Sequence, residues 1–329
     1  MIIDANSSDA TEPIVWTGST NFTTTQINTD ANNVVIIKDA AIAQAYTTEF
    51  NEMWGSTGLT PNTVNSKFGP FKTDNTPHSF NVGGITVEVY FSPTDGLNAK
   101  LQQAIESADF DLYFGIYSFT LASDANIIAD RIQHNVYTAG IIDPTSSSYP
   151  PYVSLSPLMG ANLIKDNITG LYHNKMLIVD PCAPNSDPLV LTGSFNWSTA
   201  ADTKNDENIV IIHNAAIANI YYQAFYQNFT DEGGTLVVQS GIPSVSKPMA
   251  TTIYPNPCTD FTTIKTNEPL TLNNTEISIF DVIGKEIYPP ISKNNDSFKI
   301  DTRQLVEGMY FIQIKTFNAV EIKKLQVIK

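Results

Sequence analysis

Alternation between apolar and polar positions divides the chain into strands and helices. Residues 84–91 (GITVEVYF) alternate with a period of two and predict a strand, and the largely apolar residues 111–119 predict another. Apolar residues at helical spacing predict helices over 97–108 and 123–135. Further elements are expected as strands at 172–180, 188–192 and 207–212 and as a helix at about 214–229. Strands that alternate with helices predict a mixed α/β sheet covered by helices.

Two parts of this pattern repeat at an offset of 175 residues. WTGSTNFT at 16–23 overlays LTGSFNWS at 191–198, and NNVVIIKDAAIAQAY at 32–46 overlays ENIVIIHNAAIANIY at 207–221. A match of this length at one offset indicates two copies of one structural unit. The sequence therefore predicts two lobes related by pseudo-two-fold symmetry.

The second copy has more sequence ahead of its TGS stretch than the first. Met1–Asp4 (MIID) overlays residues 177–180 (LIVD) after a one-residue loop adjustment. The counterparts of His173 and Lys175 would then fall just before Met1. The pattern predicts either a chain cut at its front edge or a first copy whose site has degenerated.

Composition shifts set the expected domain boundaries. A stretch of Gly, Pro, Asn and Ser without periodicity predicts a connector, and a second change in composition further along predicts a linker. Between them, a Pro/Ser-rich loop at 143–157 is a candidate wall of the site. Short alternating strands follow, which predict a small all-β sandwich. The predicted order is a first repeat at 1–55, a connector at 56–83, a complete second repeat at 84–232, a linker at 233–252 and the sandwich at 253–329.

Charge and cysteine content restrict the function classes. The chain has 18 basic and 33 acidic residues, a net charge of −15, which argues against a non-specific nucleic-acid binder. No apolar run approaches the length of a membrane-spanning helix. Cys182 and Cys258 have no metal-type spacing and are expected to be unpaired thiols. The first residues lack the charged and apolar regions of a signal peptide.

The chemistry is concentrated in HxKxxxxD, formed by His173, Lys175 and Asp180, and in the GSxN that follows from Gly193 to Asn196. On a strand, His173 and Lys175 would point to the same face. An imidazole can attack phosphorus or protonate a leaving oxygen, and a lysine beside it neutralises the other phosphate oxygens. Ser194 and Asn196 add hydrogen-bond donors. This joint pattern predicts phosphoryl transfer.

With these motifs, residues 1 to about 232 resemble the phospholipase D/nuclease superfamily. The resemblance implies two such motifs facing each other across the lobe interface, a phosphohistidine on one histidine, the other histidine as general acid and then base, and no metal or other cofactor. It implies that His173 is catalytic, that Lys175, Ser194 and Asn196 bind phosphate, and that Ser19 and Asn21 do so from the first copy. Asp180 is expected to be structural, with Asp4, Gly18 and Gly193 as the other structural members of the motifs.

In this family a carboxylate further along stabilises the imidazolium, a role that Glu207 fits. Glu207 overlays Asn32, and an amide carries no charge for that purpose. Our hypothesis is that Glu207 supports His173, and which histidine is the nucleophile stays open. Without a second histidine we expect little hydrolysis from these 329 residues alone. Tyr172, Phe195 and Trp197 flank the motif and either line a substrate pocket or pack in the core.

Residues about 251–329 resemble the C-terminal sorting domain of the type IX secretion system of Bacteroidetes. The residues that carry this are YPNP at 254–257, IxIFDVIGKEI at 277–287, LxxGMYFIQI at 305–314 and the closing KKLQVIK. The resemblance implies export to the cell surface or the medium through that machinery. The expected substrate is a phosphodiester, with a phospholipid favoured over nucleic acid. The alternatives are a nuclease of the same superfamily and a surface binding protein with an incomplete site.

Overall fold

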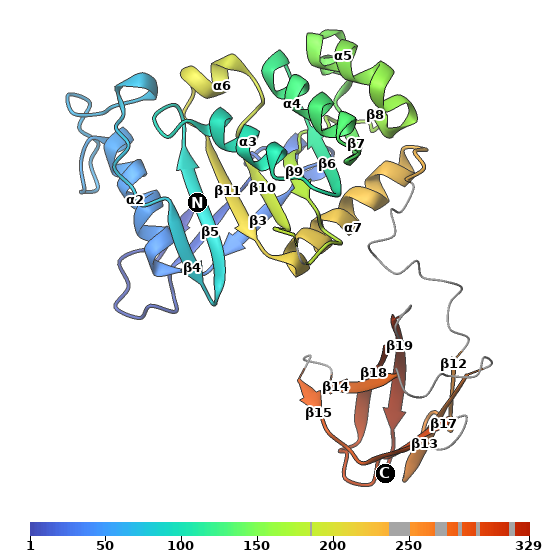
Figure 1. Cartoon of the computed structure of the whole chain (residues 1–329). Coiled ribbons are helices and arrows are strands. Elements are labelled where there is room, and N and C mark those ends of the chain that lie inside the picture. The colour runs from blue at the N-terminus through green and yellow to red at the C-terminus, as the bar shows by residue number, and fades with distance from the viewer. Residues whose placement is uncertain (185, 237–250, 267–274, 282–284, 294–296, 316–319) are drawn as a thin grey trace. The chain divides into compact units, whose positions relative to one another are not determined.

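The computed structural model describes residues 1–329 apart from 185, 237–250, 267–274, 282–284, 294–296 and 316–319 (Figure 1). The chain divides into two compact units, Met1–Val237 and Val238–Lys329. Most of the predicted linker 233–252 lies outside the described residues. Among the described residues, no helix combines the length and the apolar character needed to cross a bilayer. Cys182 and Cys258 are both free thiols, as predicted.

The second repeat is built on an eight-stranded mixed sheet in the order β4-β5-β11-β10-β9-β6-β7-β8. Strands β6, β7 and β8 run parallel, and the other neighbours are antiparallel. The mixed α/β class predicted from the sequence is confirmed. The strands are β4 (Ser79–Val82), β5 (Ile85–Phe91), β6 (Asp111–Ile116), β7 (Tyr137–Ile142), β8 (Leu163–Lys165), β9 (Lys175–Val179), β10 (Leu189–Gly193) and β11 (Asn208–His213).

Helices cover both faces of this sheet because its strands are apolar on both sides. On one face, Leu101, Ile128 and Leu155 of three helices join one core cluster with Leu177 and Leu191 of the strands. On the other face, a long helix packs two aromatic rings, Tyr222 and Phe225, against Tyr113 of β6 in tilted geometry. The helices are α3 (Leu97–Glu106), α4 (Ala122–Gln133), α5 (Pro150–Met159), α6 (Thr199–Thr203) and α7 (Ala215–Asp231).

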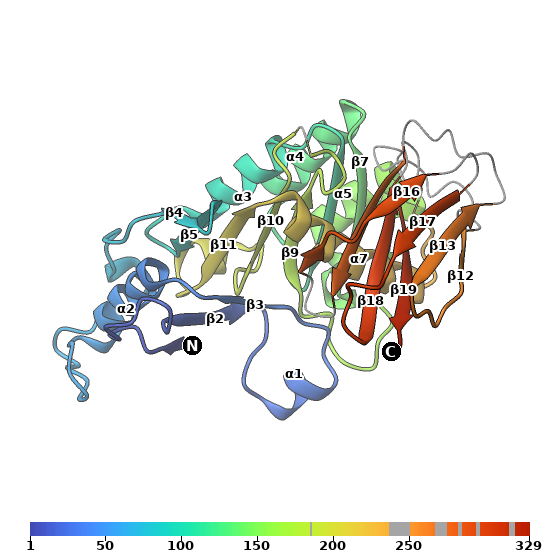
Figure 2. The same cartoon turned by 90° about the horizontal axis from the view of Figure 1, so that it is seen from below.

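The first repeat is smaller and keeps only the strands that carry the TGS turn. Its three antiparallel strands, β1 (Ile2–Ile3), β2 (Ile14–Gly18) and β3 (Val34–Ile37), pair in the order β1-β2-β3. Helix α1 (Thr24–Asn28) follows β2, and α2 (Ala40–Trp54) packs against the sheet (Figure 2). The helices α1 and α2 begin 175 residues before α6 and α7, so the sequence repeat is also a structural repeat.

Matching side chains begin these helices in the two repeats. Thr23 accepts a hydrogen bond from the first turn of α1 and Ser198 does the same for α6. Asp39 and Asn214 are the corresponding N-caps of α2 and α7. Short oxygen-bearing side chains at this position satisfy the free N–H groups of a first helical turn. The caps therefore fix where each helix starts relative to the TGS turn.

The C-terminal unit consists of two four-stranded antiparallel sheets in the orders β12-β13-β17-β16 and β15-β14-β18-β19. Ile264 and Ile300 of the first sheet share one buried cluster with Ile312 and Leu325 of the second, so the sheets pack face to face. This agrees with the predicted all-β domain. The strands are β12 (Thr251–Tyr254), β13 (Phe261–Thr266), β14 (Glu276–Asp281), β15 (Glu286–Ile287), β16 (Ile291–Lys293), β17 (Ser297–Asp301), β18 (Gly308–Lys315) and β19 (Val320–Val327).

Some expectations differ from the structure. The stretch 143–157 is largely helical, because Pro150 occupies the first turn of α5, where no N–H donor is needed. The connector is not irregular to its end, since residues 79–82 form β4 on the edge of the sheet. The strand expected at 172–180 is regular only from Lys175 to Val179. His173 therefore lies just ahead of β9 and not within it.

Candidate active site

The site begins with a glycine turn at the end of one strand in each repeat. Gly18 ends β2 and Gly193 ends β10, and both have positive φ angles (142° and 155°). A Cβ at Gly18 would lie 2.3 Å from the carbonyl oxygen of Asn33, and one at Gly193 would lie 2.1 Å from that of Asn208. Only glycine allows the two backbones to approach so closely. The structural role predicted for Gly18 and Gly193 fits this geometry.

The serine after each glycine holds the next strand. Ser19 accepts a hydrogen bond from the Asn33 N–H (3.0 Å), and Ser194 accepts one from the Asn208 N–H (3.1 Å). The side-chain amides of the same asparagines lie 3.5 Å from Ser19 Oγ and 3.4 Å from Ser194 Oγ. The Ser19 hydroxyl is also 3.4 Å from the Asn32 side-chain oxygen, and either hydroxyl can rotate to donate its proton to a ligand.

Two asparagines connect the repeats across their shared edge. Thr17 of the first repeat donates to the Asn208 side-chain oxygen of the second (2.7 Å), and Thr192 of the second donates to that of Asn33 in the first (2.5 Å). Asn33 also donates to the side chain of Asn174, the residue after His173 (3.0 Å). This crossed pair of contacts brings the segment that carries His173 against the first repeat. No role was predicted for these residues, although the 175-residue offset already overlays Thr17 on Thr192 and Asn33 on Asn208.

The His173 ring is oriented by the first repeat. Its Nδ1 lies 2.9 Å from the Ser19 carbonyl oxygen and 3.2 Å from the side-chain oxygen of Asn32. A carbonyl can only accept, so Nδ1 carries the proton and Nε2 is unprotonated. Asn32 donates its own N–H₂ to the carbonyls of Gln26 (2.8 Å) and Asp30 (3.2 Å), which points its oxygen at His173. Burial and the neighbouring Lys175 lower the pKa of His173, so the ring is neutral near pH 7.

Lys175 lies directly beside this ring. Its Nζ is 3.1 Å from Nε2 of His173 and 3.0 Å from the His173 carbonyl oxygen. Burial lowers the pKa of Lys175 to about 7, and the carboxylates of Glu207 and Asp143 act in the opposite direction. Asp143 accepts from the Tyr172 N–H and is fixed near the start of the motif. A buried ammonium next to an unprotonated imidazole nitrogen is an arrangement that can bind an anionic phosphate.

Tyr117, at the end of β6, forms an aromatic wall that the sequence did not reveal. Its ring centroid lies 4.9 Å from that of His173 and 5.2 Å from the Lys175 ammonium. Tyr172, Phe195 and Trp197, which flank the motif, are instead buried in the core. Of the two interpretations left open for these three aromatic residues, packing in the core is the one that the structure supports.

Glu207 occupies the other half of the cleft. The structure brings Asn32, and not Glu207, into contact with the His173 ring, which differs from our hypothesis. The reason is that the repeats cross: the loop before β3 of the first repeat faces the histidine of the second. Glu207 lies beside a cavity of about 570 Å³, whose wall includes Met1, Ile2, Thr17 and Asn208. The repeat offset makes this cavity the counterpart of the place that His173 and Lys175 occupy.

Asn196 and Asn21 are less closely tied to this centre. Asn196 is partly buried, and its side-chain oxygen has no hydrogen-bond partner among the described residues. Asn21 is exposed, and its backbone N–H lies 3.4 Å from the side-chain oxygen of Gln26. Both amides are therefore free to meet a ligand, and their phosphate-binding role stays a prediction.

Known proteins give this geometry its context. The family model described as "Cardiolipin synthase, PLD-like domain" matches residues 1–54 and 101–229, which is more than half of the chain. The chain belongs to the phospholipase D-like family. A second model, "Secretion system C-terminal sorting domain", matches residues 252–329, so the C-terminal unit of this phospholipase D-like protein is a sorting domain.

Individual relatives are distant. A "Phospholipase D" of Rickettsia bellii is 27% identical over 162 residues, which cover 46% of this chain and 77% of the relative. A "Mitochondrial cardiolipin hydrolase" of Xenopus laevis is 28% identical over 134 residues, covering 40% of this chain and 60% of the relative. The crystal structure of the phospholipase D family member Nuc from Salmonella typhimurium shares 25% identity and covers 46% of this chain and 99% of that one, with a TM-score of 0.40.

The aspartate of the phospholipase D-like motif points away from the cleft. Asp180 is buried and accepts hydrogen bonds from the backbone N–H groups of Asp109, Phe110 and Asp111 and from the Ser186 hydroxyl. Four donors hold this carboxylate at the end of β9, which fits the predicted structural role. Asp4 shares its left-handed backbone conformation, with φ of 52° against 47°, and marks the same position in the first repeat.

The other three histidines lie outside the cleft of this phospholipase D-like unit. His213 is held between Glu88 and Asp187, which raises its pKa to about 9. His134 lies at the end of α4, with its Nδ1 2.8 Å from the Asp130 carbonyl oxygen. His78 belongs to the connector. The contacts of His213 and His134 are those of histidines with a structural role.

Proposed function

We propose that the chain is a phosphodiesterase of the phospholipase D type, which hydrolyses phosphodiester bonds through a phosphohistidine and without a metal. The observation that carries this proposal is the fixed His173 ring. Nδ1 is held by the Ser19 carbonyl, Nε2 is unprotonated, and the Lys175 ammonium lies 3.1 Å from Nε2. A neutral imidazole with an unprotonated nitrogen beside a cation is suited to attack an anionic phosphorus centre.

In the proposed first step, the Nε2 lone pair of His173 attacks phosphorus. The N–P bond forms as the bond from phosphorus to the leaving oxygen breaks. Lys175 neutralises the non-bridging oxygens, and the hydroxyls of Ser19 and Ser194 with the amides of Asn21 and Asn196 are proposed to donate to them. Water then cleaves the N–P bond, which returns the free imidazole and releases the phosphate product.

The leaving alkoxide needs a proton, and the half of the cleft around Glu207 is where we place its donor. A carboxylate stabilises an imidazolium, which is the acid form that this step uses. Among the described residues, no histidine lies beside Glu207. We therefore expect these 329 residues to react with an activated diester but to turn over an ordinary one slowly.

Trapping the intermediate tests this proposal. Bis(p-nitrophenyl) phosphate has a leaving group that departs as the phenolate and needs no acid. We expect a burst of up to one equivalent of p-nitrophenol and a phosphoryl adduct on His173, located by mass spectrometry after alkaline quenching. The H173N variant should lose both, with H134N as the matched control, and EDTA should change neither. An adduct elsewhere, or a burst that H173N retains, would overturn the proposal.

The proposed substrate is a phospholipid. The relatives named above are a phospholipase D and a cardiolipin hydrolase, and the net charge of −15 repels a nucleic-acid polyanion. The same residues would serve a nuclease, so the assay compares phosphatidylcholine, cardiolipin and single-stranded DNA in parallel. Release of head groups supports the lipid assignment. Cleavage of DNA alone would replace it with the nuclease.

A non-catalytic binding protein is the second candidate, because the described residues place one histidine at the cleft and not two. A binding protein would hold a phosphodiester without the burst or the adduct. Calorimetric binding of dimethyl phosphate together with failure of the trapping experiment would support this candidate.

We further propose that the sorting domain directs the protein to the cell surface or the medium through a type IX secretion system of the Bacteroidetes kind. The match over residues 252–329 supports this proposal. Expression in a host with that machinery should place the full chain outside the cell, and deletion of residues 253–329 should retain it. Equal export of both forms would contradict the assignment.

A further inference from the structure

The part of the connector that precedes β4, residues 56–78, contains a buried cation. Lys72 is only 4% exposed, although the sequence indicated nothing but an irregular linker. Its ammonium contacts the carboxylate of Glu49 on α2 and lies 3.1 Å from the carboxylate of Asp206. A lysine is rarely buried unless its charge is paired, so this contact is a specific feature of the fold.

The connector also meets the backbone beside Asp206. The N–H of Gly69 donates to the Asp206 carboxylate at 2.7 Å. Gly69 has a φ of 53°, and a Cβ there would lie 2.6 Å from the carbonyl oxygen of Lys204. Gly69 and Lys72 thus contact and fix the segment 204–206, which lies immediately before Glu207.

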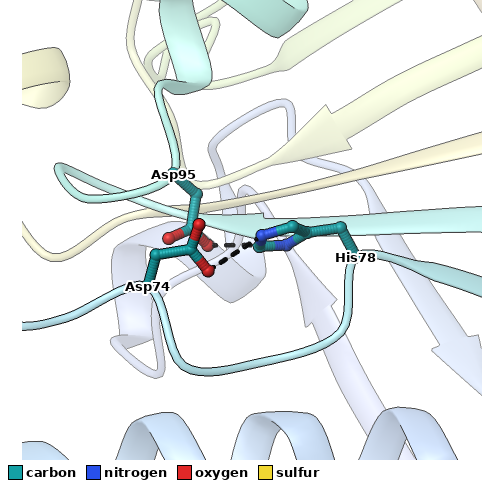
Figure 3. Close-up of side chains that lie close together, drawn as sticks. All are labelled: Asp74, His78 and Asp95. Carbon is teal, nitrogen blue, oxygen red and sulfur yellow. Dashed lines mark hydrogen bonds and ion pairs between the residues drawn. The ribbon is translucent and has the colours of Figure 1, made fainter.

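A second contact reaches Glu207 from the other side, through the turn after β5. Figure 3 shows His78 of the connector facing Asp74 and Asp95, with ring nitrogens 3.0 Å and 3.8 Å from their carboxylates. Asp95 accepts from the N–H of Phe91, the residue before Ser92 (2.7 Å). Nδ1 of His78 lies 3.1 Å from the Val89 carbonyl oxygen on β5, and this contact anchors the connector beside the turn that contains Ser92.

Ser92 binds the backbone of Glu207 directly. Its N–H donates to the Glu207 carbonyl, and its hydroxyl accepts from the Glu207 N–H, both at 2.9 Å. The same hydroxyl donates to the carbonyl of Asn205 at 2.8 Å. The backbone of Glu207 is therefore fixed between Ser92 on one side and the segment held by Gly69 and Lys72 on the other. Asn205 in that segment donates its side-chain N–H₂ to the Glu207 carboxylate at 3.1 Å.

The first repeat holds the corresponding loop differently. The counterpart of Asp206 there is Ala31, which carries no charge for a lysine to bind. That loop is held instead by the segment leading to His173, because Leu171 donates to Asp30 and accepts from the Ala31 N–H. Among the residues that the structure describes, the connector contacts are therefore found beside Glu207 and not beside Asn32.

We propose that Gly69 and Lys72 of the connector are positioning residues that hold the Glu207 carboxylate at the cleft. The inference rests on the proposed function in taking Glu207 as a working carboxylate. In this arrangement the segment between the repeats does more than join them. It sets the geometry of the half of the cleft that has a charged partner.

Two matched pairs of variants test the proposal. Asp206→Asn and Glu49→Gln each remove one carboxylate charge from the same Lys72 ammonium, but only the first loosens the segment before Glu207. Gly69→Ala pushes the connector off Lys204 without changing any charge, whereas Gly58→Ala in the same connector meets no atom within 4 Å. Circular dichroism confirms that each variant is folded.

The first readout is hydrogen exchange of the Glu207 and Asn208 amides, followed by mass spectrometry. We expect exchange at least about tenfold faster in D206N and G69A than in E49Q and G58A, because local opening removes the protection of these amides. The second readout is the pH midpoint of dimethyl phosphate binding. The Glu207 carboxylate raises the pKa of Lys175, and a less well positioned carboxylate would raise it less. The pH midpoint should therefore fall in D206N and G69A but not in E49Q and G58A.

Equal effects of the two members of each pair on exchange would overturn the positioning role, because they would report a general loss of stability. A protein that does not bind dimethyl phosphate at all would refute the proposed function instead. In that case the exchange data still decide whether the connector holds Glu207.

Discussion

The two halves of the cleft are built from the same turn but present different chemistry. In one half, the neutral amide of Asn32 accepts from Nδ1 of His173. In the other half, the equivalent position is Glu207, a carboxylate beside a cavity. An amide does not stabilise an imidazolium as a carboxylate does, so the first environment favours a neutral nucleophile and the second a charged acid. Equivalent positions of a repeat can thus divide two catalytic roles between them.

Free imidazole should expose this difference most strongly. The cavity beside Glu207 can admit imidazole, and a general acid is worth about 10²–10⁴-fold in rate. We expect imidazole to accelerate hydrolysis of a diester with a poor leaving group, such as methyl phenyl phosphate, by about 100-fold or more. The E207Q variant should lose this acceleration while keeping the burst with bis(p-nitrophenyl) phosphate. Acceleration that E207Q retains would show that the two halves do not differ in this way.

Lys175 provides the next largest effect. A charge-assisted hydrogen bond contributes about 1.5–3 kcal/mol, so K175M should weaken dimethyl phosphate binding by about 10–100-fold. K165M on the exposed end of β8 is the matched control and should bind as the wild type does.

The same residue predicts a pH dependence. The ammonium form of Lys175 binds the anion, and its pKa is lowered to about 7. Affinity should therefore be full below this pH and fall as the pH rises through about 7, whereas an unperturbed lysine would keep it beyond pH 9. Dimethyl phosphate keeps its charge over this range, so calorimetry reports the protein group alone. A flat profile from pH 6 to 9 would contradict the burial of this ammonium.

Making the halves alike should have a smaller effect. Asn32→Asp would place a carboxylate at Nδ1 of His173, and we expect the pKa of His173 to rise by about one unit, because an opposite charge this close favours the imidazolium. NMR titration of the ring measures the shift. The variant also loses two N–H donations to the carbonyls of Gln26 and Asp30, which should cost about 1–3 kcal/mol in the free energy of unfolding. An unchanged or lower pKa of His173 would contradict the contact between the Asn32 side chain and the His173 ring.

The sequence predicted the parts of this fold that depend on local patterns. Strands and helices with clear periodicity appear within a few residues of their expected bounds, and the repeat located both TGS turns. The prediction was wrong where a local signal misleads. In α5, a proline-rich sequence forms a helix because a proline fits the first helical turn. The short edge strand β4 was likewise missed, because it forms by pairing with β5 and its own sequence has no clear strand pattern.

The sequence pointed to some residues of the candidate site but not to the contacts between them. The HxK motif pointed to His173 and Lys175, because the motif combines an imidazole and an ammonium at a spacing of two residues. The pairing of His173 with Asn32 depends on how the repeats cross, and no spacing within one repeat encodes this. Tyr117 approaches the ring from β6, and Lys72 reaches Asp206 from the connector, for the same reason. Only the assembled structure shows which half of the cleft each group serves.

The most direct test of the central claim is the protonation state of the His173 ring. Long-range ¹H–¹⁵N NMR at pH 7.5, with H173N to assign the signals, distinguishes a protonated from a free ring nitrogen. The account predicts a proton on Nδ1, a free Nε2, and a shift of the Nε2 resonance when dimethyl phosphate is added. A proton on Nε2, or no response of this ring to the phosphodiester, would contradict it.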